Sequence, residues 1–287
     1  MKKKNKFVSS LYITLLFIFL FAPIAVLIVF SFNSSKSTVN MSGFSLRWYK
    51  NLFEDGATLT ALRNSVVLAV VSSVISTVMG TAAAYGICKM RKKLLKSAVM
   101  TVTNIPMMNP DIITGISLML MFVFVGTLLK FSESLSFWTM LIAHITFCLP
   151  YVILSVMPKF NQMDKSMPEA ALDLGCTPIQ SFFKVELPEI MPGVMTGGLM
   201  AFTMSLDDFV ISYFTKGSSF QTLPLLIYGM TKKTVTPKIY ALATIIFVVI
   251  LVLLISTNII SSRDERKQAK IRKSLNRGET TSGNRSL

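Results

Sequence analysis

Long runs of apolar residues, separated by shorter polar segments, dominate the pattern of this chain. Six of the runs are long enough to cross a bilayer, which takes about 20 residues of helix. Several contain glycine, proline or polar residues, which spanning helices tolerate where neighbouring helices satisfy the freed backbone groups. The pattern predicts an all-α membrane protein with six transmembrane helices, over residues 7–32, 62–88, 98–126, 135–157, 190–214 and 239–261.

The polar segment between the fourth and fifth runs carries the start and stop signals of short helices. Ser166 stands three residues before Glu169, the spacing of a capping box, and Pro168 fits a first helical turn. Gly175 follows Leu174, where a helix end favours a residue that tolerates positive φ. A Thr-Pro pair then repeats the start signal, so we expect two short helices joined at the glycine. The apolar positions expected to be free for docking on the first helix are Ala170, Ala171 and Leu174.

The same segment has the residue order Glu-Ala-Ala, three residues, Gly, nine residues, Ile, one residue, Leu-Pro. This order is the loop signature of bacterial ABC importer permeases, and the chain departs from it only at Val185, where isoleucine is usual. The chain therefore resembles this EAA-loop family. The resemblance implies the type I ABC importer transmembrane fold, with a coupling-helix loop that contacts a separate ATPase. The coupling residues it implies are Glu169, Ala170, Ala171, Leu174, Gly175, Val185, Leu187 and Pro188.

Composition and charge agree with a membrane protein and set its orientation. Hydrophobic residues make up 52% of the chain and charged residues only 15%, which is too apolar for a soluble domain of this length. With the N-terminus inside, the cytoplasmic segments hold most of the 29 lysine and arginine residues. We therefore expect a multi-pass protein of the bacterial cytoplasmic membrane, with both termini and the coupling loop in the cytoplasm. The first run is too long for a secretion signal and is interpreted as an uncleaved anchor.

Three divisions of the chain follow from the pattern. Residues 1–61 hold the first helix and an external loop whose aromatic residues suit a membrane interface. Residues 62–256 form the permease domain, and residues 257–287 the end of the last helix and a basic cytoplasmic tail. Anionic lipid headgroups explain such a tail more simply than nucleic acid does.

The chain lacks the residues that its own catalysis would require. No phosphate-cradling G-x-x-x-x-G-K-[ST] sequence and no catalytic constellation occurs, so the chain is not expected to be an enzyme. A single histidine, His144, cannot build a metal site, and interhelical hydrogen bonding is its expected role. The cysteines Cys88, Cys148 and Cys176 show no C-x-x-C pairing and are expected to be structural thiols. We expect no cofactor in this chain, with ATP and Mg bound by a partner ATPase.

Three carboxylates inside the apolar runs are candidates for a solute pathway, because a buried charge is costly unless it faces protein or water. Asp111 follows an Asn-Pro pair that could start a broken helix. Asp207 and Asp208 lie in the outer half of the fifth run, close to where an external solute would arrive. One of the pair could meet a cationic solute. The alternative is that one caps a kink and the other pairs with a basic residue of a partner.

A second resemblance is carried by four further segments, residues 44–49, 205–212, 223–230 and 241–244. These segments resemble spermidine/putrescine permeases of the PotC type. The resemblance implies a polyamine importer built from this chain, a second homologous permease, two copies of a cytoplasmic ATP-binding subunit and an extracytoplasmic binding protein. A permease for another small organic cation or solute is the alternative. A stand-alone ion-driven carrier or channel is a second alternative, but it would give the coupling loop no function.

Overall fold

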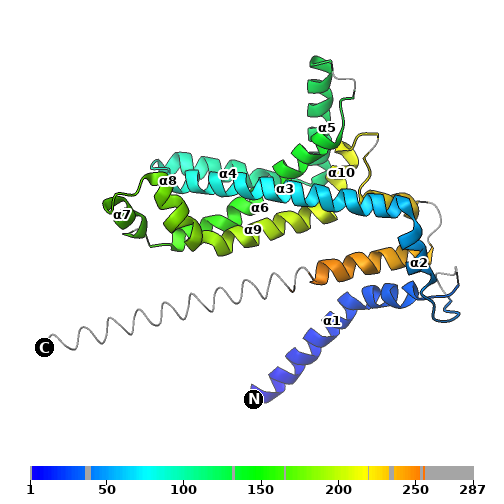
Figure 1. Ribbon diagram of the computed structural model, residues 1–287. Coiled ribbons are helices and arrows are strands. Elements are labelled where there is room, and N and C mark those ends of the chain that lie inside the picture. The colour runs from blue at the N-terminus through cyan, green and yellow to red at the C-terminus, as the bar shows by residue number, and fades with distance from the viewer. Residues whose placement is uncertain are drawn as a thin grey trace. The chain divides into compact units, whose positions relative to one another are not determined.

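A computed structural model describes residues 2–35, 40–130, 133–164, 166–218, 220–232, 236–252 and 255. The chain divides into two compact units, one of Met1–Arg63 with Leu223–Val252 and one that contains Asn64–Thr222. Figure 1 labels the helices, whose bounds are α1 (Lys2–Ser31), α2 (Arg47–Glu54), α3 (Gly56–Lys89), α4 (Lys93–Met108), α5 (Asp111–Leu128), α6 (Phe137–Gln162), α7 (Ser166–Asp173), α8 (Pro178–Ser181), η1 (Phe182–Glu186), α9 (Leu187–Asp207), α10 (Val210–Thr215) and α11 (Leu223–Thr231). A further helix covers Pro237–Val252.

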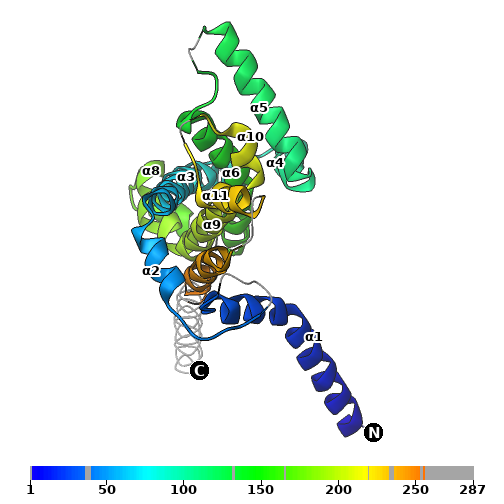
Figure 2. The ribbon, with the colours of Figure 1, turned by 90° about the vertical axis from the view of Figure 1, so that its right-hand side faces the viewer.

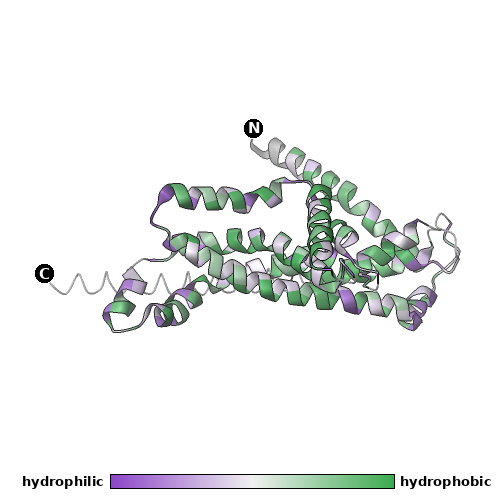
Figure 3. Ribbon diagram, turned by 90° about the horizontal axis from the view of Figure 1, so that it is seen from above, coloured by the Kyte–Doolittle hydropathy of each residue, from purple (hydrophilic) through white to green (hydrophobic). Residues whose placement is uncertain are grey.

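The described residues are helical apart from turns and one isolated bridge between Asn33 and Phe44, in agreement with the predicted all-α class. Hydrophobic residues cover most of the length of the long helices in Figure 3, and many hydrophilic ones lie near helix ends and turns. Within the described part of the chain, four helices are long and apolar enough to cross a membrane, so the number six is not confirmed. They are Val8–Ser31, Gly56–Lys89, Asp111–Leu128 and Phe137–Gln162.

Two of the six predicted runs are each divided into two helices. The predicted run 98–126 is interrupted after Met108, because Pro110 cannot continue α4 and instead precedes the first turn of α5. The predicted run 190–214 is interrupted at Asp208, whose extended backbone separates α9 from α10. Residues 256–261 of the sixth predicted run and the basic tail lie outside the described residues.

The unit around Met1–Arg63 has a small core of its own. Trp48 and Leu52 from α2 pack with Leu223 and with Ala241 and Leu242 of the last described helix. The indole N–H of Trp48 also donates to the backbone oxygen of a buried asparagine, at 2.7 Å. The external loop predicted to lie at the membrane interface therefore places two of its apolar side chains in a protein core. Others of that loop, including Phe44, Leu46 and Phe53, are exposed.

The unit that contains Asn64–Thr222 is built around α6, with α3 and α9 running beside it, as Figures 1 and 2 both show. Small residues let α9 approach α6 closely. A Cβ atom on Gly197 would lie 3.1 Å from Cα of Val152, and one on Gly193 would lie 2.9 Å from the backbone oxygen of Ser155. Helix α5 leaves this bundle at a steep angle in both views and packs on α10, where Gly115 contacts Phe214.

Candidate functional site

The loop between α6 and α9 folds into the two predicted short helices, α7 and α8, at one end of the bundle (Figure 1). Helix α7 ends in a Schellman motif: the Gly175 N–H donates to the Leu172 oxygen at 2.9 Å, and the Cys176 N–H donates to the Ala171 oxygen at 3.0 Å. Gly175 has a φ of +87°, the left-handed region that glycine adopts without a Cβ penalty. The predicted turn at Gly175 is therefore observed.

The N-terminus of α7 is capped differently from the prediction. Ser166 lies inside the helix, and its N–H donates to a carboxylate oxygen of Asp164 at 3.0 Å. Hydrogen bonds from Ser166 lower the pKa of Asp164 below its usual value, since they favour the charged form. Asp164 thus has the capping role assigned to Ser166, because Ser166 is already the first residue of α7 and its own N–H needs an acceptor outside the helix.

Helix α8 begins with the predicted start signal. The Gln180 N–H donates to the Thr177 hydroxyl at 3.3 Å, and the Thr177 N–H donates to the Gln180 side chain at 3.0 Å, which completes a capping box. The Ser181 hydroxyl donates to the backbone oxygen of Pro168 at 3.5 Å and so joins α8 to α7. The five-residue π-helix η1 then leads into α9, and such π segments are frequent at functional sites.

The loop presents an apolar surface that no described residue covers, formed by residues that follow α7 and that lie on α8 and η1. Leu174 is 87% exposed, and Ile179 and Phe183 are also largely exposed. Ala171, expected to be free for docking, is instead buried against the loop itself. Of the other predicted coupling residues, Glu169, Ala170, Gly175 and Pro188 are exposed, and Val185 and Leu187 are half-buried.

An ion pair that the sequence analysis did not anticipate holds this loop to the bundle. The Glu186 carboxylate, only 2% exposed, lies 3.0 Å from the Lys89 ammonium at the end of α3. Beside this pair, the ring of Phe182 packs edge-on against Tyr85, with centroids 4.7 Å apart. Glu186 stands inside the loop signature, but 97 residues separate it from Lys89, so nothing in the local pattern identifies the pair.

A second group of polar residues surrounds the break between α9 and α10. The Asp208 side chain is 7% exposed, and its carboxylate accepts hydrogen bonds from the N–H groups of Ile211 at 3.2 Å and Ser212 at 2.7 Å. Asp208 therefore caps the first turn of α10. Its second carboxylate oxygen also lies 3.5 Å from Nε2 of His144 on α6.

His144 connects this break to the neighbouring helices, as expected of a histidine that makes interhelical hydrogen bonds. Its Nδ1 lies 2.8 Å from the Ser205 hydroxyl of α9, and its Nε2 lies 3.0 Å from the Ser212 hydroxyl of α10. Ser72 of α3 donates to Ser205 at 2.8 Å. Four helices thus meet in one buried hydrogen-bonded cluster, whose serines carried no signal that the sequence analysis used.

The other two candidate carboxylates are exposed. Asp207 is the last residue of α9, one position before the capped break. Asp111 is the first residue of α5, where the helix dipole favours a negative charge. The structure therefore separates the adjacent pair, with Asp208 directed into the protein and Asp207 open to its surroundings.

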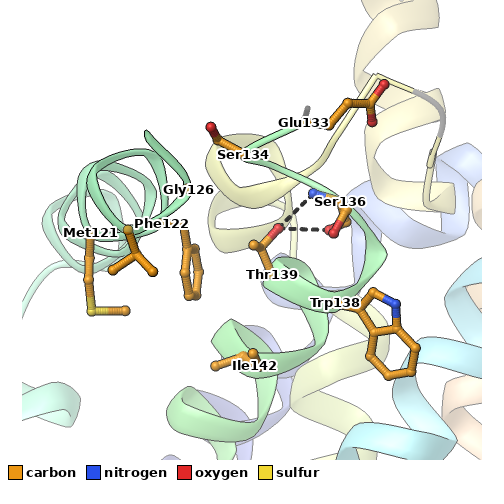
Figure 4. A pocket seen from close by; sticks show the side chains of 10 residues that line it. Met121, Phe122, Gly126, Glu133, Ser134, Ser136, Trp138, Thr139 and Ile142 are labelled. Carbon is orange, nitrogen blue, oxygen red and sulfur yellow. Dashed lines mark hydrogen bonds between the residues drawn. The ribbon is translucent and has the colours of Figure 1, made fainter. Parts of the chain in front are cut away.

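A pocket of about 590 Å³ lies between the C-terminal half of α5 and the start of α6, and Figure 4 shows its mainly apolar lining. At its α6 side, the Thr139 hydroxyl caps the helix start by hydrogen bonds with the Ser136 backbone. None of the predicted site residues line this pocket, and in the described ranges no group of histidine, cysteine and carboxylate side chains could hold a metal ion.

Comparison with solved structures shows which known fold the chain has. The chain superimposes on a bacterial ABC transporter involved in the import of the acidic polysaccharide alginate, with a TM-score of 0.69, 18% identity and coverage of 91% of this chain and 96% of that one. The methionine ABC transporter MetNI gives a TM-score of 0.52 over 72% of this chain and 97% of that chain, at 17% identity. The fold is that of ABC transporter membrane subunits.

The sequence model of binding-protein-dependent transport system inner membrane components matches residues 76–265, and the chain belongs to this family. It is 39% identical to the spermidine/putrescine transport system permease protein PotC of Escherichia coli K12, over 89% of this chain and 94% of that protein. It is 38% identical to the putrescine transport system permease protein PotI of the same strain, over 80% and 82%.

Family membership makes this chain the inner membrane permease of a binding-protein-dependent ABC importer. A permease subunit of this family binds no ATP of its own, so a partner ATPase supplies the energy and a binding protein delivers the solute. The chain is a multi-pass inner membrane protein and not an enzyme.

Proposed function

We propose that this chain is one of two homologous permease subunits of a polyamine importer, with two copies of a cytoplasmic ATPase and a periplasmic binding protein. Permeases named for spermidine and putrescine are 38–39% identical to it over most of its length, which supports the solute class. The similarity to an alginate importer does not bear on the solute, because one scaffold serves many solutes.

The observation that carries the proposal is the apolar surface of the loop that contains α7, α8 and η1. Leu174 after α7, Ile179 on α8 and Phe183 on η1 project from this folded loop, which suits docking into a groove of the ATPase. Two capped helices keep their shape when pulled, so ATPase closure would displace them as a unit. Residues Glu169–Pro188 are thus the coupling loop in this proposal.

The membrane topology is part of the same proposal. We infer six spans, in which α9 with α10 forms the fifth and the helix Pro237–Val252 belongs to the sixth. The positive-inside rule puts both termini and the coupling loop in the cytoplasm. The division into residues 1–61, 62–256 and 257–287 then separates the first helix with its loop, the permease domain and the basic tail.

The proposed solute pathway uses Asp207, Asp208 and Asp111 in different ways. A polyamine carries two or more ammonium groups, and exposed carboxylates lower the cost of removing their water. Asp207 and Asp111 are exposed and could contact the solute directly, whereas Asp208 is committed to capping α10. Binding must stay modest, because a site that holds its solute too tightly cannot release it.

The coupling surface is tested in liposomes that contain the assembled complex, with labelled spermidine and putrescine as solutes. Leu174→Asp should lose the co-purified ATPase and ATP-driven uptake, because it puts a charge into an apolar contact. Leu94→Asp is the matched control, since Leu94 on α4 is 88% exposed and lies outside the loop. Uptake at the full rate by this chain without any ATPase would overturn the proposal. Uptake of a different cation, with no uptake of spermidine or putrescine, would replace the polyamine assignment by that cation.

The pathway is tested with Asp207→Asn and Asp208→Asn, which remove charge while keeping size. We expect Asp207→Asn to lower uptake by about 5- to 150-fold, the equivalent of a charge-assisted contact of roughly 1–3 kcal/mol. ATP hydrolysis stimulated by the binding protein should persist. Parental uptake by both single variants and by the double variant would show that the carboxylates are structural.

A further inference from the structure

The last turn of α3 and the π-helix η1 touch through two pairs of side chains. Tyr85 and Lys89 lie four residues apart on α3, so both face the same neighbour. Phe182 and Glu186, also four residues apart, meet them from η1: the rings are 4.7 Å apart and the charged atoms 3.0 Å apart. An apolar contact and an ion pair thus join the same two elements.

Breaking the ion pair of Lys89 and Glu186 would leave a buried charge in the loop without a partner. Glu186 is almost fully buried, and its second carboxylate oxygen has no hydrogen-bond partner in the described part of the chain. Lys89 is therefore the charge that compensates the buried carboxylate, while its own ammonium also lies 5.3 Å from the centre of the Tyr85 ring. A buried charge that loses its partner is strongly disfavoured, so η1 and α3 are expected to move together.

The connection continues outward to the coupling surface. The Ser181 hydroxyl binds the Pro168 backbone oxygen and joins α7 to α8, and α8 runs directly into η1. A displacement of α7 and α8 would then reach α3 by two routes: through α9, and directly through the contact with Lys89. Coupling energy passes through such contiguous packed and ion-paired contacts when the elements move as rigid bodies.

We propose that Lys89 and Glu186 are positioning residues for energy coupling: their ion pair, together with the contact of Tyr85 and Phe182, transmits movement of the coupling loop to α3. This inference rests on the proposed function of the loop. It assigns a role to α3 and to Glu186, which occupies the one position between Val185 and Leu187 that the loop signature leaves unspecified.

The test compares Lys89→Met and Glu186→Gln with the parental complex in liposomes, measuring uptake and ATP hydrolysis together. Both variants should lower the spermidine imported per ATP hydrolysed by about 2- to 30-fold, the range found for substitutions along a coupling path. Lys89→Arg keeps the charge and should stay close to the parental ratio. Lys92→Met is the matched control, because it removes an exposed positive charge three residues further along.

A merely structural role predicts a different result. Uptake and hydrolysis would then fall together, in proportion to the folded complex recovered, and the ratio would stay parental, which would overturn the inference. A ratio in Lys89→Met equal to that in Lys92→Met would also overturn it. The double variant Lys89→Glu with Glu186→Lys should recover part of the ratio if the pair acts as a unit.

Failure of the proposed function has its own signature. A parental complex that hydrolyses ATP without importing spermidine or putrescine would exclude the polyamine assignment. The coupling role of Lys89 and Glu186 would then be judged by the ATP hydrolysis that the membrane subunits evoke from the ATPase, measured per folded complex recovered. Lys89→Met and Glu186→Gln should lower this value and Lys92→Met should not. Equal hydrolysis in all three variants would overturn the coupling role of Lys89 and Glu186.

Discussion

The chain interrupts its helices near both groups of candidate residues, once at Gly175 between α7 and α8 and once at Asp208 between α9 and α10. The turn at Gly175 is exposed, and its geometry depends on backbone hydrogen bonds and one positive φ. The break at Asp208 is buried, and its geometry depends on side chains from α3, α6, α9 and α10.

The difference lies in how far each interruption depends on the rest of the fold. A Schellman motif needs only its own residues, so the exposed turn can keep its shape while the loop moves against a partner. The buried cluster is stable only when all its members are present, because a partly satisfied polar network costs more than an apolar one. The exposed turn is thus suited to transmit movement, and the buried break to hold helices in register.

The largest effect is expected where the buried break loses its cap. Asp208→Ala would remove the acceptor for two backbone N–H groups, and each buried donor left without a partner costs about 1–3 kcal/mol. We expect a clear fall in the heat stability of the purified complex. The measurement is the fraction of complex that remains monodisperse after heating in detergent.

Asp207→Ala is the control for this change, because the adjacent carboxylate is exposed. It should leave heat stability near the parental value while uptake falls. Equal stability of the two alanine variants would mean that the buried cluster does not depend on Asp208, and the contrast between the two interruptions would be lost.

A smaller effect on stability, with a large effect on transport, is expected at the exposed turn. Gly175→Val forces a β-branched residue into positive φ, at a cost of about 1–2 kcal/mol, although a Cβ atom there would meet no neighbour. Uptake should fall while insertion and heat stability persist. Gly175→Asn should retain more uptake, since asparagine tolerates this conformation, and equal uptake by the two variants would show that the turn geometry matters little.

The sequence predicted the exposed turn well because its signals are local. Gly175, the Thr177 start signal and the Leu-Pro end of the loop act within a few residues of themselves. The N-terminal cap was assigned to the wrong residue because both Asp164 and Ser166 can cap a helix, and only the path of the chain decides between them.

The buried break was harder to predict, since no proline or glycine stands at Asp208 or beside it. Its extended backbone is stabilised by residues 61 to 133 positions away from their partners, such as His144 with Ser205 and Ser72 with Ser205. The break at Pro110 carried a proline signal and was considered in advance, and the cap at Asp208 corresponds to the alternative in which one carboxylate of the pair caps a kink. Contacts between distant positions, including Lys89 with Glu186, follow from packing and have no local signature.

The capping box of α8 allows a finer test of the exposed turn. Thr177→Ala should cost about 1 kcal/mol, because the Gln180 N–H loses its acceptor. We expect a modest decrease in ATP-driven uptake and an unchanged melting temperature for the whole complex, since the loss stays within the loop. Thr177→Ser keeps the hydroxyl and should behave as the parent, whereas a broad loss of stability in Thr177→Ala would show that the loop is not independent of the bundle.

The smallest effect is expected at a third junction, between α2 and α3, which lies between the other two in exposure. Asp55 directly follows α2 and accepts a hydrogen bond from the Lys238 ammonium at 2.6 Å and one from the Thr58 hydroxyl at 2.7 Å. The bond from Lys238, followed by that from Thr58, lowers the pKa of Asp55 below its usual value. A lowered pKa in the folded state means that the carboxylate adds stability above its unfolded pKa and loses it as pH falls through the folded one.

Both side chains of this ion pair are 26% exposed, so solvent screening limits its contribution to about 1 kcal/mol or less. Between about pH 5 and pH 2, the parental complex should therefore lose slightly more heat stability than Asp55→Asn does, because only the parent has this carboxylate to protonate. Lys50→Met is the matched control, since the ion pair of Lys50 with Glu54 on α2 is largely exposed. Identical pH profiles for the parent and Asp55→Asn would show that the charge of Asp55 does not stabilise the α2–α3 junction. The junction would then resemble the exposed turn at Gly175, whose structure depends on backbone geometry.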